Sequence, residues 1–243
     1  MNAHLSSRGA AVVELDALKS RKNLSDVFNG NGAGGTCKRA CFLDRLYTEQ
    51  AAGNALSPWV GDCAHLAELS YDELPPDPVP SSSSRQALAS FVREFSLDRD
   101  GNSLAMAVRK DFAFHRKSIH VRHSFHNKSG QSAIFWFGSE SNIALLPEEL
   151  DAIAVDASVF KHKDTQGSFD PVNATRLSFR GLDKTDSVSW HVSTAARLSL
   201  APLLYQCKDG KQEAQGYSML FVWPISLEPG AQWAVDMSVS LYE

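Results

Sequence analysis

The residues that could carry out chemistry in this chain are separate acids and a small group of histidines. Cleavage of a glycosidic bond needs two carboxyl groups about 5 Å or about 6.5–9.5 Å apart across a cleft. Single acids lie in or beside strand-like segments at Glu14, Glu140, Asp156 and Asp236, and no local motif pairs any two of them. We therefore interpret them as solvated or structural acids and predict no catalytic residue.

The densest histidine group is the candidate for a metal site and consists of His115, His120, His123 and His126. Zinc binding needs three or four ligands that converge tetrahedrally. On an extended strand His120 and His126 share one face, whereas His123 points to the other face with the apolar residues. One strand cannot supply all three ligands, so we predict no metal site and no cofactor.

The four cysteines are too few for a disulfide scaffold in a chain of 243 residues. Cys37 and Cys41 have three residues between them, one more than in the Cys-x-x-Cys pairs of redox and zinc sites. Together with Cys63 and Cys207 they could still converge in space. We interpret the four as buried thiols of a reduced protein.

Five tryptophans supply aromatic planes on which the CH face of a pyranose ring could stack. Trp190 and Trp233 lie on alternating apolar faces and are predicted to pack in the core. Trp59 has a loop-like setting, and Trp136 lies in a strand-like segment that could also be buried on both sides. We select Trp59 and Trp136 as the candidate carbohydrate-binding residues.

Alternating apolar residues predict that strands position these side chains. In the last segment Trp233, Val235, Met237 and Val239 recur at every second position, which is the period of a half-buried antiparallel strand. Many such segments, separated by turn residues, predict an all-β fold, a large antiparallel sandwich or barrel. The predicted strands cover residues 104–112, 118–127, 133–139, 151–160, 175–182, 187–193, 196–205, 217–227 and 233–242.

The first third of the chain has a less regular pattern. Residues 9–16 predict a first strand, and residues 38–50 fit either a short helix or a compact turn. Residues 85–97 fit a helix or a strand, because their apolar residues match both periods. Flexible loops are predicted at 29–36, which is rich in glycine, and at 74–84, which is rich in proline and serine.

Size and composition suit a single globular domain that covers residues 1–243. Hydrophobic residues make up 43% of the chain and charged residues 21%, which is ordinary for a soluble protein. A formal net charge of -4 argues against a nucleic-acid or anionic-membrane partner. The N-terminus lacks a secretory apolar segment, and no stretch approaches the roughly 18 apolar residues of a membrane span. We expect a cytoplasmic protein.

Four segments, in this order, resemble the C-terminal region of glycoside hydrolase family 57 proteins, the α-amylase and 4-α-glucanotransferase group. Gly9-Ala-Ala-Val-Val-Glu-Leu-Asp is similar to the family's Gly-Gly-x-x-x-Glu-Leu-Asp strand. Cys37-Lys-Arg-Ala-Cys-Phe-Leu-Asp-Arg-Leu is similar to its Arg-x-Ser-Phe-Leu-Asp-His-Phe segment. Met106-Ala-Val-Arg-Lys-Asp-Phe and Ile119-His-Val-Arg-His-Ser-Phe-His-Asn resemble its Lys-containing strand and the Tyr-x-Leu-x-Asn strand that follows. Ala214-Gln-Gly-Tyr, which runs on to Trp223, resembles its Tyr-Gln-Gly hairpin and closing strands.

This resemblance implies a supersandwich of the galactose-mutarotase type, with two twisted antiparallel sheets face to face. The family's catalytic barrel, with its Glu nucleophile and Asp acid/base, has no counterpart here, and the family's paired glycines are Gly9-Ala10. The implied function is therefore a non-catalytic carbohydrate-associated module. It would bind α-glucan or oligosaccharide weakly through Trp59 and Trp136, or dock on a separately encoded catalytic barrel.

Self-association would also cover an apolar surface that a barrel no longer covers. Two alternatives stay open. One is a sugar epimerase that acts within the sandwich through two histidines and a carboxylate. The other is a structural remnant of a split gene.

Overall fold

The computed structural model describes residues 2–5, 11–14, 41–47, 65–68, 72–73, 87–99, 102–143, 145, 150–161, 169–182, 186–206 and 212–241. Within these ranges every regular element is a β-strand, so the predicted all-β class is confirmed. The strands are β1 Asn2–Leu5, β2 Ala11–Glu14, β3 Leu43–Tyr47, β4 His65–Glu68, β5 Asp72–Glu73, β6 Ala87–Arg99, β7 Asn102–Phe114, β8 Ser118–Asn127, β9 Ala133–Ile143, β10 Leu150–Val155, β11 Ser158–Lys161, β12 Phe169–Gly181, β13 Asp186–Gln206, β14 Gln212–Leu227 and β15 Gln232–Leu241.

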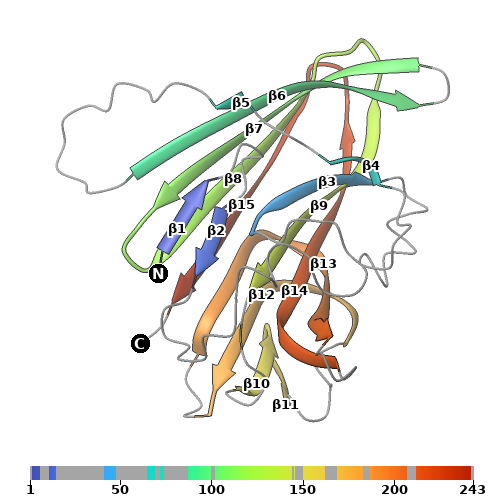
Figure 1. Cartoon of the computed structure of the whole chain (residues 1–243). Helices are drawn as coiled ribbons and strands as arrows, with labels where there is room; N and C mark the ends of the chain where they lie inside the picture. The colour runs from blue at the N-terminus through green and yellow to red at the C-terminus, as the bar shows by residue number, and fades with distance from the viewer. Residues whose placement is uncertain are drawn as a thin grey trace.

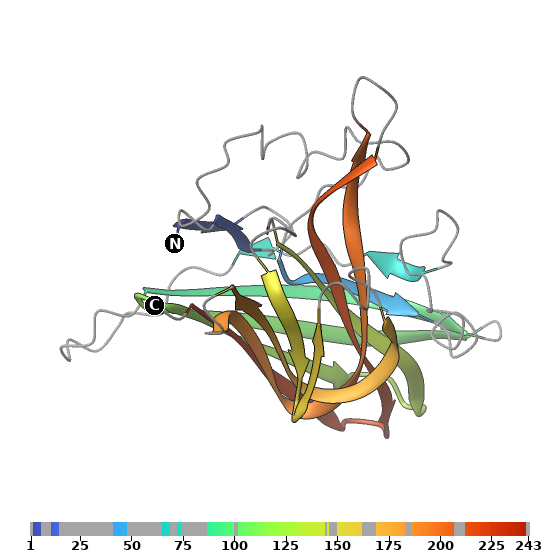
Figure 2. The same ribbon diagram turned by 90° about the horizontal axis from the view of Figure 1, so that it is seen from below.

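The long strand β13 joins two layers of one curled, 13-stranded antiparallel sheet (Figure 1). Its residues 188–192 pair with β15, and its residues 197–206 pair with β14. The first layer continues from β15 through β8, β7 and β6 to β5, and the second layer continues from β14 through β9 and β3 to β4. Seen from below, the two layers curve around a shared interior (Figure 2). The predicted antiparallel sandwich is therefore confirmed, with its layers continuous through β13.

The core between the layers is rich in aromatic rings. Phe125 of the first layer lies 4.9 Å, between ring centroids, from Phe137 of the second layer. Phe137 in turn stacks on Trp223 at 5.7 Å, and Trp233 packs partly buried against the same group. Trp190 is 1% exposed, so both tryptophans predicted for the core contribute to it. Such rings bury large areas and hold the two layers together.

Two predictions for local structure are wrong. Residues 38–50 were predicted as a helix or a compact turn, but residues 43–47 form strand β3, which pairs with β9 and β4. The predicted strand 151–160 is instead the hairpin of β10 and β11, because Asp156 adopts a φ of 48° in the two-residue turn between them. An aspartate tolerates this left-handed conformation better than most residues, and no glycine marks the turn in the sequence.

Strand pairing decides the structure of one ambiguous segment and joins two predicted strands into one. Residues 85–97 fitted both periods, and the described part of this segment, residues 87–97, lies in strand β6, which pairs with β7 along its whole length. The separately predicted strands 187–193 and 196–205 belong to the single strand β13. The loops predicted at 29–36 and 74–84, and Trp59, lie outside the described residues. In the part of the chain that is described, no helix is long and apolar enough to span a membrane.

Candidate functional site

Strand β3 carries buried charges on both of its faces. Successive side chains of a strand point to opposite sides, so Asp44 faces the interior and Arg45 faces away from it. Register pairs Asp44 with Ser139 and Arg45 with Gly138 on the neighbouring strand β9. We call the side of β3, β9 and β14 that bears Arg45 the second face. All five residues of β3 are buried, so each face of the strand is covered.

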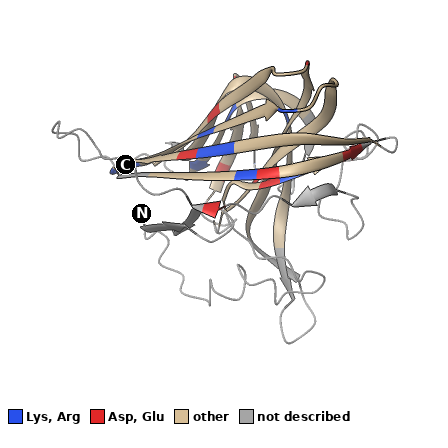
Figure 3. Ribbon diagram, turned by 90° about the horizontal axis from the view of Figure 1, so that it is seen from above, with Lys and Arg blue, Asp and Glu red and all other residues tan. Residues whose placement is uncertain are grey.

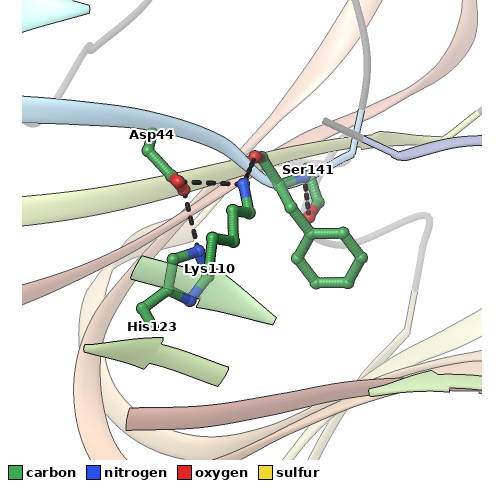
Figure 4. Close-up of polar contacts among 5 residues, drawn as sticks. Asp44, Lys110, His123 and Ser141 are labelled. Carbon is green, nitrogen blue, oxygen red and sulfur yellow. Dashed lines mark hydrogen bonds and ion pairs between the residues drawn. The ribbon is translucent and has the colours of Figure 1, made fainter. Parts of the chain in front are cut away.

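The interior cluster consists of Asp44, Lys110 and His123, and it bridges the two layers (Figure 4). Oδ2 of Asp44 accepts a hydrogen bond from Nζ of Lys110 at 2.8 Å, and its Oδ1 lies 3.0 Å from Nε2 of His123. Lys110 also donates to the backbone carbonyl of Phe42. The three ionisable side chains are 0% exposed. Lys110 and His123 are register partners on β7 and β8, so two donors from the first layer meet one acid from the second.

Burial and mutual charge shift the pKa values of this cluster. Burial lowers the pKa of His123 below its usual range, although Asp44 opposes this shift. Burial also lowers the pKa of Lys110, against the opposing effects of Asp44 and Cys41. For Asp44, burial alone would raise the pKa, but His123 and Lys110 together hold it far below its ordinary value. The carboxylate therefore stays ionised, and a neutral His123 donates to it through Nε2, which leaves Nδ1 as a buried acceptor with no hydrogen-bond partner among the described residues.

Contacts with β9 and with Lys110 of β7 hold the two residues that precede strand β3. Phe42 has a φ of 59°, a conformation that is unfavourable for a bulky residue. Its N–H donates to Oγ of Ser141 at 3.3 Å, and Lys110 takes up its carbonyl. The thiol of Cys41 donates to the carbonyl of Asn142 at 3.3 Å. Cys41 is a buried thiol, as predicted, whereas the other three cysteines lie outside the described residues.

The second-face cluster is centred on Glu140 and lies within one layer. The carboxylate accepts hydrogen bonds from Nη1 of Arg45, from Nδ2 of Asn142 at 2.9 Å and from Oγ of Ser218 at 3.3 Å. These residues come from the adjacent strands β3, β9 and β14. The Arg45 side chain is 11% exposed and that of Glu140 only 2%. Arg45 and Glu140 thus form a charge-neutral pair with polar neighbours.

Aromatic residues lie beside this cluster on the same face. Tyr47 pairs with Trp136 in register, and its ring lies over Gly138, where an added Cβ would be 2.6 Å from its Cε2. Trp136 is half-buried and packs against Tyr47 and its apolar neighbours. Because Trp136, Gly138 and Glu140 alternate along β9, they share the second face. The predicted stacking residue Trp136 therefore lies in line with the charged pair.

The described residues limit the chemistry that these clusters can perform. Glu140 and Asp44 lie on opposite faces of one layer, so they cannot act as a carboxylate pair across a cleft. A histidine and a carboxylate converge at His123 and Asp44, but both side chains are enclosed between the layers. No group of three potential metal ligands occurs among the described residues. His120 and His126 point away from the core and His123 towards it, as the strand period predicted.

Charges on the exposed side of the first layer pair with opposite charges. Arg109 lies 2.8 Å from Asp111, and Arg122 lies 2.9 Å from Asp236. Bands of acidic and basic residues lie next to each other on these long strands (Figure 3). Among the described residues, this side therefore presents mixed charge.

Sequence reasoning missed the partners of both clusters, although one signal was present. Lys110 follows Met106 and Val108 at the same apolar period on β7, so the pattern places a cation in the core. His123 has the same position in the pattern of β8. Charged residues at core positions indicate buried partners, since an unpaired buried charge is very costly. No local signal identified Arg45, because β3 was not predicted as a strand.

Comparison with known proteins shows similarity of fold. No family model matches the chain, and no curated protein matches it. Among solved structures, it is similar to the 4-alpha-glucanotransferase from Thermococcus litoralis with a TM-score of 0.59 and 13% identity. That match covers 86% of this chain and only 28% of the glucanotransferase.

Galactose mutarotase-like proteins are also structurally similar. One from Clostridium acetobutylicum has a TM-score of 0.47 and 10% identity, over 97% of this chain and 87% of that chain. A galactose mutarotase related enzyme from Lactobacillus acidophilus has a TM-score of 0.46 and 11% identity, over 72% of each chain. At such identities the likeness concerns the fold alone.

Proposed function

We propose that this chain is a non-catalytic carbohydrate-associated module that binds α-glucan or oligosaccharide weakly through the second face. The observation that carries the proposal is the half-buried Trp136 on the same face as Arg45 and Glu140. An indole ring can stack on the CH face of a pyranose. Because Arg45 is neutralised by Glu140, the ligand would be a neutral sugar. The proposal places the protein in the cytoplasm as a single domain.

Two lines of support come from outside the cluster. The fold is similar to a part of a 4-alpha-glucanotransferase that amounts to 28% of that chain. The four segments that resemble the family 57 C-terminal region include cluster residues on three strands. These are Asp44 and Arg45 on β3, Lys110 on β7 and His123 on β8. A binding module that accompanies a glucan-active enzyme is consistent with both.

A second candidate is docking on a separately encoded catalytic barrel. Ile134, which is 48% exposed, lies two residues before Trp136 on the second face, and Pro224 is exposed in register with Trp136. This apolar end of the face would suit a protein partner as well as a sugar. In a variant of this candidate, the partner at the same end of the face is a second copy of the chain. An epimerase site is not favoured, because the converging His123 and Asp44 are fully enclosed.

Native gels with and without embedded glycogen test the proposal. We expect the protein to be retarded by glycogen and Trp136→Ala to lose most of this retardation, because the stacking plane is gone. Trp136→Phe should keep part of it, and His120→Ala, which changes an exposed ring on the other layer, should keep all of it. Trp59→Ala tests the other predicted stacking residue in the same assay.

Unchanged migration of the wild-type protein would contradict glucan binding. Retardation that survives in both Trp136→Ala and Trp59→Ala would place the binding surface elsewhere. A shift only on addition of a family 57 barrel would support docking instead.

A further inference from the structure

We propose that the interior cluster of Asp44, Lys110 and His123 fixes the register of strand β3 and so keeps Arg45 beside Glu140 on the second face. Lys110 and His123 would then be positioning residues for that face, acting through Asp44. Only the ligand-binding consequence of this inference rests on the proposed function.

Hydrophobicity alone does not choose the register of β3. Leu46 faces the interior, whereas Leu43 and Tyr47 face the other side, and all five residues of the strand are buried. Register is strongly specified where one face is apolar and the other polar, and weakly specified where both are alike. The strand is also short, with five residues in its pairing with β9. Its register therefore needs another determinant.

The charges supply that determinant. A shift of one residue would exchange the two faces of the strand. Arg45 would then point at the two donors Lys110 and His123, and Asp44 would join Glu140 on the second face. Both changes bring like charges together in a buried setting, which is very costly. The observed register instead satisfies both acids with donors.

The donors have fixed positions because they belong to the long strands of the first layer. Lys110 lies between the buried residues Val108 and Phe112 on β7, and His123 lies between Val121 and Phe125 on β8. Both strands are paired on both sides. Lys110 also holds the carbonyl of Phe42, the residue whose left-handed conformation precedes β3. The same ammonium group therefore contacts the backbone at the start of β3 and an interior side chain within it.

A variant with apolar residues in place of the cluster tests the register of β3 separately from the stability of the fold. The triple variant Asp44→Leu/Lys110→Met/His123→Leu removes the three mutually bonded groups together, so none of the three is left as an unpaired buried charge and the layers can stay packed. We expect amide hydrogens of β8 to exchange within about threefold of the wild-type rate and those of β3 to exchange at least about tenfold faster. The control Arg122→Ala/Asp236→Ala removes an exposed ion pair and should leave both strands unchanged. Unchanged protection of β3 in the triple variant would overturn the inference.

Acid titration of the wild-type protein gives a second test if the triple variant does not fold. The charged groups that act on His123 are Asp44 from β3, Lys110 from β7 and Asp236 from β15, while Cys41 acts on Lys110. As the pH falls, protonation of the enclosed His123 should release β3 before the rest of the sheet opens. Loss of protection in β3 and β8 at the same pH would contradict the inference.

Glycogen retardation of the same variants distinguishes this inference from the proposed function. If the wild-type protein is not retarded, glucan binding fails, but the exchange rates of β3 still decide the register. If the wild-type protein is retarded, the triple variant should lose retardation together with the protection of β3. A triple variant that is retarded as strongly as the wild-type protein would show that the cluster does not position the second face.

Discussion

The two charged clusters of β3 differ in what they connect. The interior cluster joins the two layers, with Lys110 and His123 from the first layer and Asp44 from the second, and its side chains are fully enclosed. The second-face cluster joins adjacent strands of a single layer, and its Arg45 keeps some exposure beside the half-buried Trp136. Adjacent residues of one strand thus contribute to two different environments.

The difference indicates which cluster suits a ligand. A charge that is satisfied from both layers can be reached only if the layers separate. On the second face the charged pair is also buried, but Trp136 is half-buried and Ile134 is 48% exposed, so this end of the face has surface that a ligand can contact. We therefore propose that the interior cluster serves packing and register, and that ligand recognition belongs to the Trp136 end of the second face.

The largest expected effect comes from removing one partner of the interior cluster. Lys110→Ala removes a cation that offsets the buried negative charge of Asp44. Breaking a buried pair in this way costs about 3–5 kcal/mol. The free energy of unfolding in urea should fall by that amount. Lys128→Ala removes an exposed ion pair with Glu94 and should leave the unfolding midpoint unchanged. Equal midpoints for Lys110→Ala and the wild-type protein would remove the structural role given to the interior cluster.

Gly138→Ala tests the second face with a single methyl group. The new Cβ would lie 2.6 Å from Cε2 of Tyr47 and would displace its ring. Overpacking of this kind costs about 1–3 kcal/mol, and the displaced ring should also weaken glycogen retardation. Gly130→Ala is the matched control, because no heavy atom of the described residues lies within 4 Å of its added Cβ. If both alanine variants unfold at the wild-type urea concentration, the close approach of Tyr47 does not constrain this face.

Acid should weaken the interior cluster in a way that depends on His123. Burial lowers its pKa in the folded protein below the ordinary value of 6.5, so the unfolded chain takes up the proton more readily. The stability contributed by neutral His123 is therefore present above about pH 6.5 and declines as the pH falls through the folded pKa. Urea midpoints measured between about pH 7 and pH 5 should fall in the wild-type protein and fall less in His123→Gln.

The glutamine of His123→Gln can still donate to Asp44 but does not titrate. His120→Gln controls for loss of an exposed histidine on the same strand. An identical pH dependence in His123→Gln and the wild-type protein would assign the acid sensitivity to another group. Protonation of Asp44 itself belongs to a lower range, below about pH 4, because its pKa is depressed from 3.8.

The smallest effect is expected from Arg122→Ala. The Arg122–Asp236 pair has a distance of 2.9 Å, close to the 2.8 Å between Lys110 and Asp44, but its side chains are more than half exposed. Exposed pairs contribute about 0–1 kcal/mol. The urea midpoint should therefore change little, and glycogen retardation should not change. A loss of stability as large as that of Lys110→Ala would show that distance, and not burial, decides how much these ion pairs stabilise the fold.

The sequence by itself determined the class of fold and the faces of its strands. The period of two placed His123 among core residues and His120 and His126 outside it, and it predicted strands across most of residues 104–242. This information is local, because the direction of a side chain in a strand depends only on its position in the alternation. The same pattern selected Trp136 but could not show which side of its strand is covered.

Only the tertiary structure decided which charged residues meet. Asp44 and Lys110 are 66 residues apart in the chain, and Arg45 and Glu140 are 95 residues apart. Their contacts depend on the pairing of β3 with β9 and on the facing of two layers, neither of which is encoded in a local period. The backbone of residues 43–47 adopts a strand because β9 and β4 supply its partners. Long-range pairing of this kind outweighs the weak local preferences of a five-residue segment.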